Sequence, residues 1–112
     1  MAMNRTVRIA IRLRSPSVAG AGYRLSRLAD DPEALAYQEQ LKREQQEIIG
    51  RIEAAVGEPL TVRRRLTRTA NVISAEAPLG LLEVIAAVEG VAGVTVERQY
   101  RIDPPADRPV TK

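Results

Sequence analysis

The segment Leu66–Tyr100 constrains the fold most, because its pattern predicts a strand, a short helix and a second strand. Alternating β-branched residues indicate the two strands, at 72–73 and again at 94–96. Between them, residues 79–88 are almost wholly apolar, as in a helix packed on a sheet, which Pro78 is expected to open and Gly90 to end. A unit of this kind is a crossover that places its two strands parallel.

The first half of the chain predicts a similar unit. Residues 6–13 alternate between apolar and mostly basic side chains, which is typical of a strand with one buried face. A connector over 15–30 contains proline and glycine and is expected to be mobile. Asp31 and Pro32 then form a helix start, and the helix is expected to run to about Val56, before a glycine and a proline. Its apolar stripe is expected at Leu41, Ile48, Ile49, Ile52, Ala55 and Val56.

Three further elements complete the prediction: strands over 60–66 and 70–76, and a last strand over 94–102. In the first of these, Arg64 falls on the same face as the apolar residues Leu60, Val62 and Leu66. Two explanations fit this arginine: a bulge in the strand, or an edge strand whose inner face meets solvent.

The element order strand, helix, strand, strand, helix, strand predicts an α+β, ferredoxin-like βαββαβ sandwich. In this fold a four-stranded antiparallel sheet carries two helices on one face. The domain is expected over 1–103, with a flexible C-terminal tail over 104–112 that contains two adjacent prolines. The other sheet face is bare, and is either solvated or a docking surface. On it we expect Arg8, Ala10, Arg12, Val72, Ser74, Thr95 and Glu97.

Composition argues against an enzyme. The chain has no histidine and no cysteine, which removes the commonest general base, thiol chemistry and most zinc sites. The segment 20–22 (GAG) lacks the glycine and lysine of a phosphate loop. We therefore expect no catalytic residue, no metal and no cofactor. The strands carry no aromatic residue before Tyr100, and the net charge is only +3, so no nucleic-acid partner is expected.

The basic run 63–65, with Arg68 close behind, is the sharpest charge feature. Such a run is typical of an edge strand that is protected from pairing by its charge. It also fits contact with phosphate or with an acidic protein, and a salt-dependent shift assay would detect nucleic-acid binding.

Three segments resemble the propeptides of subtilisin-type peptidases, and together they cover about residues 6–103. The first, at 36–49, is AYQEQL followed by QQ and II, and is similar to the family's first helix. The second is NVIS at 71–74, followed by Pro78. The third is EGVAGVTVERQY at 89–100, which is similar to the family's closing Pro-Gly-Val to Tyr pattern. The departures are Val72 for glycine, Glu89 for proline and Glu97 for aspartate.

The resemblance implies an intramolecular chaperone and inhibitor that acts on a subtilisin-like serine peptidase in cis or in trans. In that family the bare sheet face docks on two surface helices of the enzyme, and a carboxylate caps their positive N-termini. Glu97 is the candidate by position, with Glu76 second. The segment after the last strand is implied to enter the active-site cleft, at 100–103 or at the end 110–112. The implied peptidase contacts are Val72, Ser74, Glu76, Thr95, Glu97, Tyr100, Arg101, Ile102 and Asp103.

A second hypothesis is a ferredoxin-like regulatory or assembly module that dimerises through the bare face. The propeptide hypothesis instead expects a monomer when free, because the face must stay available. No apolar run reaches the length of a membrane helix, so no membrane partner is expected. The first residues lack an apolar signal-peptide core. The localisation is thus left open between an intracellular protein and an excised piece of a secreted precursor.

Overall fold

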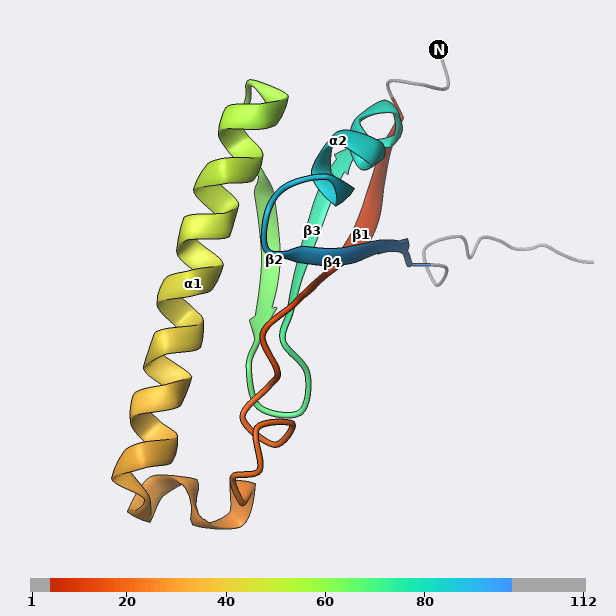
Figure 1. The fold of residues 1–112 in the computed structure, drawn as a ribbon. Helices are drawn as coiled ribbons and strands as arrows, with labels where there is room; N and C mark the ends of the chain where they lie inside the picture. Colours follow the sequence, from red (N-terminus) through yellow and green to blue (C-terminus); the bar gives the residue numbers. More distant parts are fainter. Residues whose placement is uncertain (1–4, 98–112) are drawn as a thin grey trace, which may run out of the picture.

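The computed structural model describes residues 5–97, and its secondary structure follows the predicted order (Figure 1). The strands are β1 (Thr6–Leu13), β2 (Thr61–Leu66), β3 (Val72–Pro78) and β4 (Val91–Val96). The helices are α1 (Pro32–Val56) and α2 (Leu82–Ala86), with 3-10 helices η2 (Leu25–Asp30) and η3 (Leu79–Leu81).

The four strands form one sheet in the order β2-β3-β1-β4, and every neighbouring pair is antiparallel. β3 and β4 therefore run in the same direction with β1 between them, as expected for strands joined by a helical crossover. This arrangement confirms the ferredoxin-like α+β fold. It leaves β2 and β4 as the two edges of the sheet.

Both helices pack on the same face of the sheet. The buried side chains of β1 alternate from Val7 to Leu13, as predicted, and those of β3 are Ile73, Ala75 and Ala77. They form one core with buried isoleucines of α1 and α2, namely Ile48, Ile49, Ile52 and Ile85. Burying an aliphatic side chain of this size contributes about 1.5–3 kcal/mol, so this shared core holds the helices on one side.

The ends of α1 lie where the sequence predicts them. The Asp31 carboxylate accepts hydrogen bonds from the N–H groups of Glu33 and Ala34, at 3.0 and 3.2 Å. Gly57 ends the helix in the left-handed region, at φ 82°. Ala55 is exposed, so its predicted place in the buried stripe is wrong.

The connector before α1 carries a small core of its own, which the sequence pattern did not reveal. Val18 and Leu28 are buried there against Ala34 and Leu41 of α1. The N–H of Val18 also donates to the carbonyl of Thr67, at 2.9 Å. The connector is thus fastened both to the helix and to the β2–β3 turn.

Tyr37 closes one side of this small core. Its hydroxyl donates a hydrogen bond of 2.7 Å to the carbonyl of Pro16, and its ring packs on that of Tyr23 with centroids 5.7 Å apart. Burial raises the pKa of the Tyr37 hydroxyl above its ordinary value, and the nearby Glu44 and Tyr23 raise it further. The tyrosine is therefore held in its neutral, hydrogen-bond-donating form.

Several predicted boundaries in the second half of the chain differ from the structure. β3 begins at Val72 rather than at residue 70, and it includes Pro78, which was expected to open a helix. The helical segment is divided into η3 and the five-residue α2. β4 begins at Val91 rather than Val94, because Gly90 turns the chain at φ 98° directly before it. The predicted end of this strand lies outside the described residues.

Candidate functional site

The candidate site is the open face, which we define as the sheet face opposite α1 and α2. The strand register sorts its residues into three rows that run across the strands. The first row is Thr61, Glu76, Arg8 and Glu97. The second row is Arg64, Ser74, Ala10 and Thr95. The third row is Leu66, Val72, Arg12 and Gly93.

The first row is charged and largely neutralises itself. Glu76 lies 3.6 Å from a guanidinium nitrogen of Arg8 and 3.4 Å from Nε of Arg63. These side chains are 30%, 35% and 51% exposed, so each pair contributes only about 0–1 kcal/mol. Glu97, at the end of the row, has its N–H bonded to the Arg8 carbonyl at 2.9 Å and its carboxylate 3.4 Å from the Ser74 hydroxyl.

The second row carries mostly small side chains, and a depression in the surface lies at its β2 end. Ser74, Ala10 and Thr95 make up this row from β3 to the β4 edge, while the neighbouring rows carry longer side chains at Glu76, Arg8 and Arg12. The depression, called here the hollow, has a volume of about 400 Å³. It is lined by Arg8, Arg63, Arg64, Leu66, Val72, Ser74 and Glu97.

Arg64 differs from the other arginines of the hollow in its ion pairing. Arg8 and Arg63 share the carboxylate of Glu76, whereas no ion pair joins Arg64 to another residue within 5–97. In addition, Nε of Arg8 is buried without a hydrogen-bond partner among the described residues. The hollow thus carries positive charge that its own acids leave partly uncompensated.

A bulge in β2 explains why Arg64 lies on the open face. The register between β2 and β3 shifts between Val62 and Arg64, with Arg63 as the extra residue. The bulge and the edge position of β2, the two explanations offered for Arg64, are both present. Beyond the bulge the alternation is reversed, so Leu66 lies opposite Val72 on the open face and is 39% exposed. The predicted placement of Leu66 with Leu60 and Val62 is therefore wrong.

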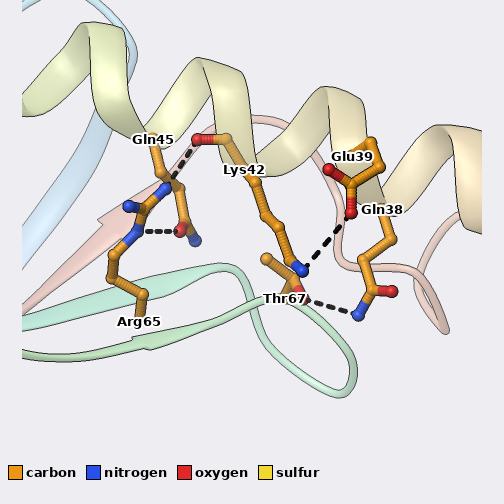
Figure 2. A network of polar contacts seen from close by, with 6 residues as sticks. All are labelled: Gln38, Glu39, Lys42, Gln45, Arg65 and Thr67. Carbon is orange, nitrogen blue, oxygen red and sulfur yellow. Dashed lines mark hydrogen bonds and ion pairs between the residues drawn. The ribbon is translucent and has the colours of Figure 1, made fainter.

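A polar network holds β2 in this orientation (Figure 2). Arg65 points the other way, toward α1, and donates to the carbonyl of Lys42 at 2.6 Å and to Oε1 of Gln45 at 3.0 Å. Gln45 is fully buried, and its amide nitrogen donates to the Leu66 carbonyl and to Asn71, both at 2.8 Å. Every polar atom of this glutamine is thereby satisfied.

The described peptidase-contact residues of the sequence hypothesis share the open face. Val72, Ser74 and Glu76 alternate along β3, while Thr95 and Glu97 come from β4 and the residue after it. The other four, Tyr100, Arg101, Ile102 and Asp103, lie outside the described residues. Sequence reasoning did not include Arg63, Arg64 and Leu66 among the contacts. The arginine next to apolar positions in 60–66 was the available signal for the bulge that places them there.

A second, larger cavity of about 680 Å³ lies on the helix side, between α1, the end of β1 and the segment 86–90. It is crossed by local contacts, such as the hydrogen bond of 2.8 Å from Ser15 to Glu44 and that of 3.2 Å from Arg51 to the Glu89 carbonyl. Within residues 5–97 no group of three acidic residues is placed to hold a metal ion. No helix in the same range is long and apolar enough to cross a bilayer.

Comparisons of the chain with protein-family models, with curated proteins and with solved structures produce no significant match.

Proposed function

We propose that the chain is a propeptide-like inhibitor and folding chaperone of a subtilisin-like serine peptidase, and that it docks through the open face. The observation that carries the proposal is the position of Glu97. This carboxylate lies on the uncovered side of the sheet, at the point where the chain leaves β4. The open face therefore extends to Glu97, the last described residue.

Electrostatics gives Glu97 a role in docking. The N-terminus of a helix carries a partial positive charge and unpaired N–H groups, which favour a carboxylate nearby. Glu97 and Glu76 both present carboxylates on the open face, in the same row. Glu97 lies at the end of this row, directly after the edge strand β4, so we take it as the first candidate for capping helices of the peptidase, with Glu76 second.

Inhibition then follows from tethering. A docked sheet holds the segment 98–112 near the active-site cleft, so that its effective concentration there greatly exceeds that of free peptide. We assign the cleft contacts to Tyr100, Arg101, Ile102 and Asp103, which lie outside the described residues. The domain needs no catalytic group of its own for this mechanism.

The test is an inhibition assay with purified subtilisin-like peptidases and a chromogenic peptide substrate. We expect inhibition at micromolar or lower concentration by the full chain, and strong weakening when residues 101–112 are deleted. Circular dichroism should show that the deletion leaves the helix content and melting temperature unchanged. An absence of inhibition across peptidases, including one encoded with or beside this chain, would remove the proposal.

The competing function is an assembly module that dimerises through the open face. Exposed apolar residues there, such as Leu66, favour it. Charge opposes it, because the face carries four arginines against two glutamates, and two copies would repel. Size-exclusion chromatography distinguishes the two functions, since a tight dimer that covers the face would leave no surface for a peptidase.

A further inference from the structure

We infer that the hollow is a receptor for an acidic side chain of the partner, with Arg64 as the residue that pairs with it. This inference rests on the proposed function and adds the chemistry of the partner's surface. The peptidase would present positive helix ends toward Glu97 and, separately, an aspartate or glutamate toward the β2 edge of the sheet.

The shape of the hollow suits a single inserted side chain. Its floor includes the small Ser74, and Leu66 and Val72 supply apolar wall on one side. Arg64 stands at the β2 end of the same row as Ser74. An acidic side chain entering along this row would place its methylene groups on the apolar wall and its carboxylate at the guanidinium.

The positive charge of the hollow favours a negatively charged group on the partner. Three arginines and Glu97 line it, and Glu76 beside it compensates Arg8 and Arg63. Because Arg64 has no ion pair among residues 5–97, its charge is available to a partner. A guanidinium forms strong, directional hydrogen bonds with a carboxylate, and burial at an interface reduces competition from water. The buried, unpaired Nε of Arg8 is a second donor beside the hollow.

The orientation of Arg64 is fixed by the rest of the fold rather than by local chance. Its neighbour Arg65 is bound to α1 through Lys42 and Gln45. Successive residues of a strand point to opposite faces, so this attachment directs Arg64 to the open face. The bulge at Arg63 completes the arrangement by bringing a further arginine to the same side.

The experiment compares inhibition constants of the full chain and the variants Arg64→Gln and Arg64→Glu against an inhibited peptidase. The matched controls are Arg43→Gln and Arg43→Glu, which make the same charge changes at an exposed position of α1, away from the open face. Each protein is assayed at about 0.05 M and about 0.5 M NaCl, where screening of surface charges differs strongly. Melting temperatures verify folding, which none of the four substitutions is expected to disturb.

We expect Arg64→Gln to raise the inhibition constant about tenfold and Arg64→Glu to raise it further, with both Arg43 variants close to wild type. The change in inhibition constant between the two NaCl concentrations should also be smaller for Arg64→Gln than for wild type. If the full chain inhibits but the Arg64 and Arg43 variants behave alike, this inference is overturned while the proposed function stands. If the full chain inhibits no peptidase, the proposed function falls and the inference falls with it.

Discussion

Arg65 donates a hydrogen bond from Nε to Oε1 of Gln45, 3.0 Å away, and so joins an edge strand to the centre of the long helix. The two residues differ in solvent exposure, because Gln45 is fully buried whereas Arg65 is exposed. The glutamine also binds the Leu66 carbonyl and Asn71, and Asn71 in turn donates to the Ser15 carbonyl at 2.9 Å. One helical side chain therefore connects β2, the β2–β3 turn and the end of β1.

Replacing Gln45 with leucine should destabilise the protein by about 2–4 kcal/mol, because three buried or partly buried hydrogen bonds are lost together. The free energy of unfolding, measured by urea denaturation, checks this. Gln46→Leu is the matched control, since Gln46 is exposed and makes one longer contact of 3.3 Å with Arg65. Similar stabilities for the two variants would show that the network contributes little.

Substitutions of the neighbouring arginines Arg64 and Arg65 of β2 should differ in their effect on stability. Arg65→Met removes the hydrogen bonds to α1 and should cost about 1–2 kcal/mol of unfolding free energy, while the methionine retains most of the aliphatic stem. Arg64→Met removes no ion pair within residues 5–97 and should change stability by about 0.5 kcal/mol or less. Equal losses in the two variants would contradict the opposite orientations of these side chains.

Two glycines should respond oppositely to alanine. Gly90 has φ 98°, and a Cβ there would lie 2.8 Å from Cδ1 of Ile48, so Gly90→Ala should destabilise by about 1–3 kcal/mol. Gly50 lies inside α1 with no atom within 4 Å of its added Cβ, so Gly50→Ala should stabilise by about 0.5–1 kcal/mol. Thermal denaturation of both variants checks the signs, and a Gly90→Ala protein as stable as wild type would contradict the turn described before β4.

Elements that depend on local chemistry were predictable from the sequence. β1 follows from its alternation, and both ends of α1 follow from Asp31 and Gly57, whose effects act within a turn of the chain. The bulge in β2 depends instead on which residues of β3 lie opposite it, and this pairing is set by the whole sheet. The reversal that brings Leu66 to the open face therefore could not be derived from the strand alone.

The two buried glutamines of α1 are visible in the sequence as polar residues within the apolar stripe of the helix. Gln38 and Gln45 occur at helical spacing with Leu41, Ile48 and Ile52, so they belong to the stripe that faces the sheet. A glutamine in such a stripe needs partners, because an unsatisfied buried amide is costly. Its partners Thr67 and Asn71 lie in the β2–β3 turn, more than twenty residues away, and only the fold identifies them.

Stability should fall at alkaline pH because of Tyr37. Its pKa is raised in the folded protein by burial, with smaller contributions from Glu44 and Tyr23. Above the ordinary tyrosine pKa of about 10 the unfolded chain loses the proton more readily, so unfolding becomes more favourable as pH rises. The contribution is constant below that pH. Urea denaturation across this range should show a smaller decline for Tyr37→Phe, and an identical decline would exclude this tyrosine as the cause.

Glu97→Gln tests the docking mechanism at its central residue. Removing the charge while keeping the shape should weaken inhibition by about 0.3–2 kcal/mol, the range for a charge near a helix end. Glu83→Gln is the control, because Glu83 is exposed on α2, on the covered side of the sheet. Glu76→Gln should have a smaller effect on docking than Glu97→Gln, since Glu76 lies on the inner strand β3 whereas Glu97 follows the edge strand β4 at the end of the row. Inhibition constants from chromogenic assays give the comparison. If Glu97→Gln inhibits as well as Glu83→Gln, the open face does not dock by offering this carboxylate to the peptidase.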